Sequence, residues 1–283
     1  MGLCYNAGVC DAGARTGFQA EGSRFMGLIL AIVNQKGGVG KTTTTVNLGA
    51  GLAAKGKKVL LVDVDPQGNA TSGLGFDKRS LEKTTYDAII NEEPIRDIII
   101  PTGRRNYSIC PANIQLAGAE VELVNTLSRE GFLKRALAPV RGDYDFILLD
   151  CPPSLGLLTV NSLTAADGVI VPIQSEFYAL EGVTQLMETI GIVHKHLNPE
   201  LEVFGVVITM FDSRTQLSGQ VAAEVKKYFG DRTFRTMIPR NVRLSEAPSH
   251  GKWIGEYDPK SKGAECYASL AREVLGRASA KKE

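Results

Sequence analysis

Two lysines and three glycines stand close together near the start of the chain, in the segment Lys36, Gly37, Gly38, Val39, Gly40, Lys41, Thr42 and Thr43. Glycines let successive backbone N–H groups turn toward one anion, and a helix that follows adds the positive end of its dipole. Lys41 would then place its charge against the β- and γ-phosphates of a nucleotide, and Thr42 would bind Mg²⁺. The usual pattern begins with glycine, but this chain has Gln35 there and a second lysine, Lys36, after it. The segment predicts a phosphate-binding loop.

Carboxylates follow two apolar runs elsewhere in the chain. Asp63 and Asp65 follow residues 59–62, and Asp150 follows residues 146–149. Parallel sheets bind their ligands at the carboxyl ends of their strands, so either acid of the first pair could serve the metal or the attacking water. Asp150 has the form of a carboxylate that holds Mg²⁺ directly or through water, with a capping aspartate as the alternative. For Asp63, structural support of its loop is an equal alternative.

These side chains need a scaffold that brings distant strand ends together. Short runs that are apolar on both faces alternate with helix-length segments from Leu28 onward. This alternation predicts a doubly wound α/β fold, with a mainly parallel sheet that helices cover on both sides. We expect strands at residues 28–33, 59–64, 107–110, 146–149, 168–173, 203–209 and 234–238, helices at 47–55, 180–196 and 216–229, and a less regular insertion at 74–143.

The first 25 residues differ in composition from the rest. They are rich in Gly, Ala, Cys and Ser and show no apolar periodicity, so we expect a disordered extension, with Met26 as a candidate natural start and residues 26–283 as one P-loop ATPase domain. Five widely spaced cysteines favour reduced thiols without a disulfide. The chain has no signal-peptide pattern and no apolar run long enough to span a membrane, which predicts a cytoplasmic protein.

The lysine at the start of the phosphate loop resembles the deviant Walker A sequence of the ParA/MinD group of P-loop ATPases. In that family the early lysine, here Lys36, reaches across a dimer interface to the phosphates of the other subunit's nucleotide. The resemblance therefore implies an ATP-sandwich homodimer with ATP and Mg²⁺ as cofactors. It also implies that Lys36 and Lys41 are catalytic and that residues 36–43 bind the nucleotide.

The acidic segments carry the resemblance further. Residues 63–69 are similar to the family's D-x-D-P-Q-x-N segment, which implies that Asp65 positions or activates the attacking water. Residues 151–153, directly after Asp150, resemble the family's D-x-P-P loop, which senses the γ-phosphate. An iron–sulfur role for the cysteines, known in related proteins, would need a suitable cysteine pair outside residues 1–25, and the sequence has none there.

Residues 238–249 and 257–259 resemble the chromosomal ParA/Soj branch of the family. There the positions of Pro239 and Asn241 line the adenine pocket, which favours ATP over GTP. Arg214 and Arg243 match positions where the family carries arginines for sequence-independent DNA binding, consistent with a basic surplus after residue 200. Such contacts reach phosphates and should weaken with salt. Further candidates for this basic patch are Lys226, Lys227 and Arg240.

The resemblance implies a partitioning ATPase with weak intrinsic activity, whose dimer binds DNA on the nucleoid until a ParB-like partner stimulates hydrolysis. The main alternative is a MinD-like ATPase that acts on a membrane site or protein cargo. Residues 278–283 lack the bulky apolar face of a membrane-inserting helix, so we expect no stable membrane association. A small-molecule kinase or synthetase on the same fold is a third possibility. An operator-binding repressor would need an N-terminal DNA-binding domain that 25 irregular residues cannot supply.

Overall fold

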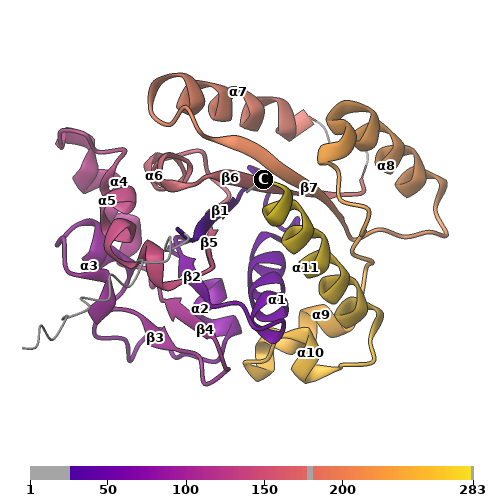
Figure 1. Cartoon of the computed structure of the whole chain (residues 1–283), viewed down its shortest axis with the longest axis horizontal. Helices are drawn as coiled ribbons and strands as arrows, with labels where there is room; N and C mark the ends of the chain where they lie inside the picture. The colour runs from indigo at the N-terminus through magenta and orange to yellow at the C-terminus, as the bar shows by residue number, and fades with distance from the viewer. Residues whose placement is uncertain (1–25, 177–180, 282–283) are drawn as a thin grey trace, which may run out of the picture.

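The computed structural model describes residues 26–176 and 181–281, and it contains a seven-stranded sheet in the order β3-β4-β2-β5-β1-β6-β7 (Figure 1). All neighbouring strands are parallel except β3, which runs antiparallel to β4. The predicted doubly wound α/β class is confirmed. The strands are β1 (Leu28–Ile32), β2 (Val59–Asp63), β3 (Ile100–Pro101), β4 (Tyr107–Cys110), β5 (Phe146–Asp150), β6 (Gly168–Gln174) and β7 (Glu202–Thr209).

The central strands are buried on both faces because helices cover both sides of the sheet. Successive side chains of a strand point to opposite sides and therefore enter different cores. Leu30 and Ile32 of β1 join one hydrophobic core, while Ile29 and Ala31 join the other. The two cores lie between the sheet and its two layers of helices. This burial explains why these strands read as continuous apolar runs in the sequence.

Helices cover each face of the sheet. One core includes residues of α1 (Lys41–Ala54), α2 (Asn69–Gly73), α9 (Val242–Glu246), α10 (Ile254–Tyr257) and α11 (Lys262–Ala280). The other includes residues of α3 (Thr85–Ile89), α4 (Leu116–Glu122), α5 (Phe132–Leu137), α6 (Leu157–Ala165), α7 (Glu181–His196) and α8 (Gln216–Phe229). Short 3₁₀ helices link several of them: η1 (Ile95–Asp97), η2 (Leu123–Asn125), η3 (Ala138–Asp143), η4 (Gly230–Arg232) and η5 (Ala247–His250).

The last helix, α11, packs beside α1 (Figure 1). Leu270 and Val274 are fully buried in the core that both helices share. Tyr267 is also buried, with its hydroxyl 3.2 Å from that of Thr44 in α1. The apolar side of α11 is therefore used in packing. None of the helices in the described ranges combines the length and hydropathy needed to cross a membrane.

The predicted strand at residues 234–238 is wrong. This segment runs beside β7, to which the N–H groups of Phe234 and Ile238 donate, but the described bridges lie on either side of it, at Thr233 and Pro239. The backbone N–H groups of Arg235 and Thr236 donate instead to the carboxylate of Glu273 in α11, at 2.7 and 2.8 Å. Successive N–H groups of a strand point to opposite sides, so two neighbouring N–H groups that donate to one carboxylate do not fit a regular strand.

Three cysteines lie in the described part of the chain, and Cys110, Cys151 and Cys266 are all buried free thiols. Cys4 and Cys10 fall outside it, as does the expected disordered extension at residues 1–25. The sequence also missed β3, because a strand of two residues gives no alternating pattern.

Candidate functional site

The glycine-rich loop joins β1 directly to α1. Gly38 and Gly40 have φ angles of 75° and 88°, which L-residues with side chains rarely adopt. No side chain caps the start of α1, so its first N–H groups can receive an anion. Val39 is buried, and its carbonyl accepts a 2.8 Å hydrogen bond from the Thr209 hydroxyl, which anchors the loop to the end of β7.

Lys41 is the first residue of α1 and is 7% exposed. Burial lowers the pKa of Lys41 from its ordinary value, and the charges of Asp150 and Asp65 oppose that shift. In the described part of the chain its Nζ donates to a main-chain oxygen, that of Lys36, at 3.3 Å, and not to a carboxylate. A buried cation held this way is placed to bind an anionic ligand.

Asp150, at the end of β5, is fully buried against α1. Its two carboxylate oxygens accept hydrogen bonds from the hydroxyls of Thr42 and Thr45, each at 2.8 Å. Burial raises the pKa of Asp150 to about 6, and the two threonine hydrogen bonds oppose the rise. The structure thus brings together Thr42 and Asp150, which lie far apart in the sequence. Sequence reasoning missed Thr45, although its spacing of three from Thr42 places both on one helix face.

Asp63 lies opposite Asp150 in the register of β2 and β5. Its carboxylate accepts hydrogen bonds from the Thr71 N–H and hydroxyl, at 2.9 and 2.7 Å, and from the Asp65 N–H at 3.2 Å. Burial, and then the charge of Asp150, raise the pKa of Asp63 to about 8. All three donors belong to the loop and helix that follow β2, so the Asp63 carboxylate holds this loop in place through hydrogen bonds. Asp65 is 6% exposed and accepts a 2.9 Å hydrogen bond from the Gln67 N–H.

Lys36 lies at the rim of the loop, with a side chain that is 41% exposed. Its Nζ is 3.4 Å from the carboxylate of Glu176 at the end of β6, which also lies 3.6 Å from the Arg240 guanidinium. The Lys36 N–H donates to the side chain of Asn34 at 3.0 Å, and the Asn34 amide donates to Pro172 at 2.7 Å. The two lysines of the loop therefore differ, since Lys41 is buried and Lys36 is open to other molecules.

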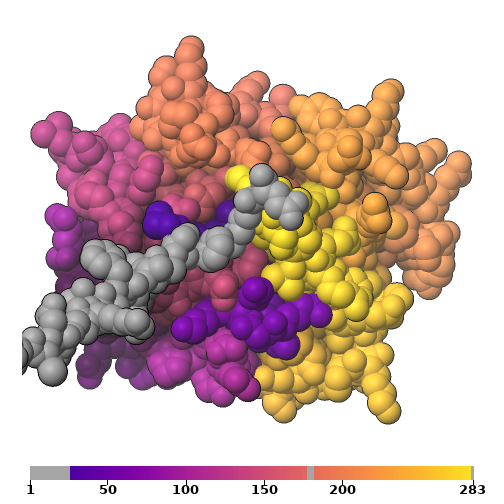
Figure 2. Space-filling model, viewed as in Figure 1, coloured from indigo at the N-terminus to yellow at the C-terminus, as the bar shows by residue number. Residues whose placement is uncertain are grey.

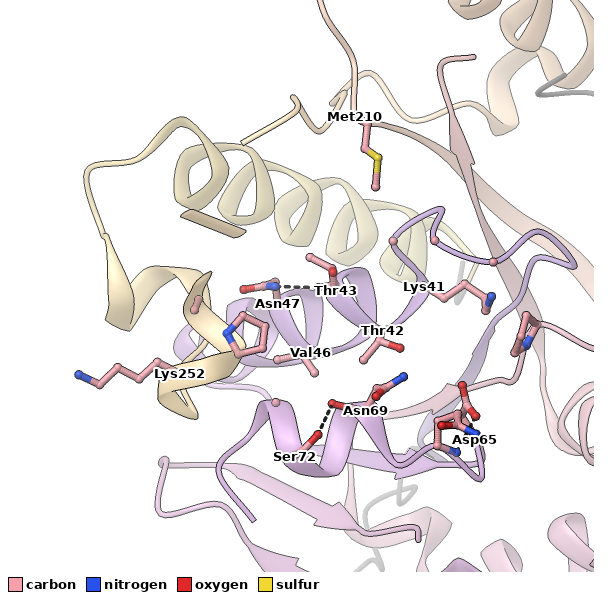
Figure 3. Close-up of a pocket in the computed structure, with 18 residues that line it drawn as sticks. Lys41, Thr42, Thr43, Val46, Asn47, Asp65, Asn69, Ser72, Met210 and Lys252 are labelled. Carbon is pink, nitrogen blue, oxygen red and sulfur yellow. Dashed lines mark hydrogen bonds between the residues drawn. The ribbon is translucent and has the colours of Figure 1, made fainter. Parts of the chain in front are cut away.

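A cavity of about 480 Å³ opens in front of the phosphate loop (Figure 3). Lys41, Thr42 and Asp65 lie around one end of it, while Asn47 and Lys252 lie around the other. Sequence reasoning missed Asn47 and Lys252. Further residues that line it are Gly37, Gly38, Gly40, Thr43, Val46, Gln67, Asn69, Ser72, Gly73, Pro153, Met210, Ala247 and Pro248.

An adjoining cavity of about 270 Å³ contains the two predicted adenine-pocket residues, Pro239 and Asn241. Gly40, Thr43 and Met210 line both cavities, so they form a continuous recess. The Asn241 side chain accepts a 2.9 Å hydrogen bond from the Arg243 N–H and thereby caps α9. This geometry has room for phosphates in one part and a base in the other.

The two predicted DNA-binding arginines are exposed but ion-paired. Arg214, with a side chain that is 86% exposed, pairs with Asp212 at 2.7 Å, and these hydrogen bonds lower the pKa of Asp212 to about 2. Arg243 pairs with Glu246 at 2.9 Å and lies 3.6 Å from Asp258. Each arginine would have to exchange a carboxylate for a phosphate in order to bind nucleic acid.

Known proteins resemble this chain in sequence and in structure over most of its length. A family model described as an AAA domain matches residues 27–203. The sporulation initiation inhibitor protein Soj of Bacillus subtilis is 62% identical over 249 residues, which cover 88% of this chain and 98% of the relative. The chromosome partitioning protein ParA of Myxococcus xanthus is 53% identical over 252 residues, 89% of each chain. A solved structure of cobyrinic acid a,c-diamide synthase from Mycobacterium smegmatis, with ADP and magnesium bound, has a TM-score of 0.80 at 40% identity and covers 90% of this chain and 97% of its own.

Proposed function

The chain belongs to the ParA/Soj family of chromosome-partitioning ATPases, and on that basis we propose that it hydrolyses ATP as a sandwich homodimer that binds DNA without sequence preference. The observation that carries the proposal is the pair of loop lysines. Lys41 is buried beside the carboxylates, while the Lys36 side chain is exposed at the rim. In the proposed dimer, Lys36 reaches the nucleotide of the second subunit.

The residues at the loop fit Mg²⁺ together with ATP. Mg²⁺ prefers oxygen ligands and usually takes one or two carboxylates, water and the phosphates of its substrate. The Thr42 hydroxyl and the Asp150 carboxylate supply oxygens of this kind, 2.8 Å apart. When bound, Mg²⁺ neutralises negative charge on the β- and γ-phosphates.

The remaining residues of the site have separate roles in hydrolysis. The N–H groups of the loop and Lys41 bind the phosphates, and Asp65 orients the attacking water. Lys36 of one subunit completes the site of the other, after it exchanges Glu176 for a phosphate. Because one subunit alone lacks this lysine contact, intrinsic turnover is slow. Loss of the γ-phosphate removes the contact that favours the dimer.

In this mechanism the nucleotide controls a DNA-binding surface. Dimerisation places two copies of Arg214 and Arg243 on one particle, so that weak phosphate contacts add together. A ParB-like partner stimulates hydrolysis and thereby releases the dimer from DNA. The protein is accordingly nucleoid-associated in its ATP state. Family membership supports this assignment, and the exposure of both arginines is compatible with it.

The test is fluorescence anisotropy with non-specific duplex DNA, in ATP, in ADP and without nucleotide, at two salt concentrations. The Asp65→Ala protein holds ATP during the measurement. We expect binding only with ATP, lost at high salt, and lost in the Arg214→Ala/Arg243→Ala protein while ATP-dependent dimerisation persists. Intact binding in the double variant would refute the DNA surface. Absence of binding in every nucleotide state, with dimers confirmed, would favour a membrane site or protein cargo instead.

A small-molecule synthase is a second candidate, because the similar solved structure is that of cobyrinic acid a,c-diamide synthase. The identity of 62% to Soj, against 40% to that synthase, favours partitioning. ATP turnover separates the two functions. A synthase would release ADP only when cobyrinic acid and an ammonia donor are present, whereas the partitioning ATPase responds to DNA and a ParB-like partner.

A further inference from the structure

A third cavity, of about 540 Å³, lies at the opposite end of α1 from the phosphate loop. The 14 residues of α1 place this cavity roughly 20 Å from the phosphate loop itself, although the ATP cavity extends along the helix as far as Asn47. Figure 2 shows the three segments that form the cavity, from the end of α1, the β3–β4 turn and α10, meeting on one face of the molecule. The lining residues are Ala50, Ala53, Ala54, Gly56, Gly103, Arg104, Arg105, Asn106, Tyr107, Trp253 and Glu256. A volume of this size is typical of small-molecule sites.

Trp253 gives the cavity a flat aromatic wall. Its indole ring is half-buried and lies over Gly255, where an added β-carbon would overlap the ring. Glycine at this position therefore makes room for the ring. The indole N–H makes no hydrogen bond with the described residues. The small side chains of Ala50 and Ala53 line the same cavity and leave space for a planar group.

The polar groups in the cavity are mostly donors. Arg104 is tied to the structure, since it donates to the Glu256 carboxylate and to the Gly251 carbonyl, each at 2.7 Å. That pairing neutralises Glu256. Arg105 is exposed, and neither its guanidinium nor the Asn106 side chain has a hydrogen bond or ion pair within the described ranges. The unpaired groups thus carry a net positive charge and favour an anion.

We propose that this cavity is a second ligand site, which binds a small organic anion with a flat ring, of the nucleoside monophosphate type. The ring stacks on Trp253, and the anionic group pairs with Arg105 and the Asn106 amide. Stacking on tryptophan tolerates different bases, so the site selects the class of ligand more strongly than the individual base.

The backbone that follows η5 links this site to the ATP cavity. Gly251 accepts from Arg104 in the second site, while its neighbour Lys252 lines the ATP cavity. Two residues on, the Ile254 N–H donates to the Asn47 side chain at 2.7 Å, and Asn47 also lines the ATP cavity. A ligand held by Trp253 therefore acts on groups at the ATP site. We expect it to change ATP affinity by about 5-fold or more, which is a usual size of allosteric coupling. This second effect rests on the proposed function, but ligand binding itself does not.

Trp253 is the chain's one tryptophan, so intrinsic fluorescence reports on the cavity directly. The full chain, loaded with Mg-ADP at its phosphate loop, is titrated with AMP, GMP, CMP, UMP or inorganic phosphate. We expect a saturable change with at least one nucleotide and none with phosphate. Arg105→Gln should weaken binding about tenfold or more, the usual loss for a hydrogen bond to a charged group. The matched control is Arg79→Gln, which removes another exposed arginine that has no ion pair in the described residues.

Lys41→Ala separates this proposal from the proposed ATPase. This variant lacks the loop lysine but should keep the fluorescence change, since the cavity lies at the other end of α1. The proposal is overturned if no nucleotide gives a saturable change. It is equally overturned if Arg105→Gln binds like the parent protein, if phosphate alone reproduces the signal, or if Lys41→Ala abolishes it.

Discussion

Replacing Thr42 by alanine is expected to weaken Mg²⁺-dependent ATP binding strongly. The Thr42 hydroxyl lies 2.8 Å from the Asp150 carboxylate. Thr45 also donates to Asp150, but the phosphate-loop pattern assigns the metal to Thr42. A hydrogen bond to a charged group contributes about 1.5–3 kcal/mol, which corresponds to about 10- to 150-fold in affinity. Thr45 still holds the other oxygen of Asp150, so the carboxylate itself should stay in place.

The measurement is a titration with a fluorescent ATP analogue, with excess Mg²⁺ and with excess EDTA. In Mg²⁺ the Thr42→Ala protein should bind about 10- to 150-fold more weakly than the parent, whereas in EDTA the two should bind alike. Thr42→Ser restores the hydroxyl and should recover most of the affinity. Thr43→Ala removes the same atoms at the next position, away from the Asp150 hydrogen bonds. Because Thr43 lines the recess, its replacement can change ATP affinity, but the gain from Mg²⁺ over EDTA should stay as in the parent.

Two results would refute this reasoning. If Thr42→Ala kept the full gain from Mg²⁺, the hydroxyl would not contribute to the metal site. If its affinity fell equally with Mg²⁺ and with EDTA, the hydroxyl would support the loop through Asp150 instead. Thermal unfolding of the variant without nucleotide distinguishes the second case, because support of the loop would lower the melting temperature as well.

Three further predictions concern stability and DNA. Gly251→Ala should cost about 2–4 kcal/mol in the free energy of unfolding, because the strain of a left-handed φ is joined by a clash of the new β-carbon, 2.7 Å from the Gly75 backbone. Gly103→Ala, with a φ of 75° but open space around it, should cost about 1 kcal/mol. Equal losses in denaturant titrations would contradict this reasoning. Asp212→Ala should leave the denaturation midpoint nearly unchanged but tighten ATP-dependent DNA binding, since it frees Arg214. Unchanged anisotropy would argue against that arginine. Leu270→Ala, at a fully buried position of α11, should cost about 2–5 kcal/mol, and a loss under 1 kcal/mol would show that the helix packs loosely.

The sequence predicted most of the fold because its signals are local. Doubly buried strands read as apolar runs, and glycines mark the turn before α1. The predicted strand at residues 234–238 failed because Glu273, almost forty positions away, takes up two of its backbone donors. Local hydrophobicity carries no information about such a capture.

The residues of the site likewise fall into those that the sequence predicted and those that it did not. Lys41, Thr42 and Asp150 could be predicted because the chemistry of a phosphate fixes their spacing or their place at a strand end. Glu176, which holds Lys36, lies 140 residues away from it and follows no motif. The role of Trp253 was also hidden, since its cavity forms only where three separate segments meet. Contacts of this kind depend on tertiary packing and not on a local pattern.

Within the residues that the structure describes, neither edge of the sheet offers a free ladder to another strand. At one edge β3 has only two residues, and Pro101 has no N–H to donate. At the other, the N–H groups of Phe234 and Ile238 occupy the outward carbonyls of Val206 and Ile208 on β7. Open edges are templates for fibre growth. Copies of this chain that meet at high concentration are therefore poor templates for one another's sheets, and contacts between them fall to loops and helices.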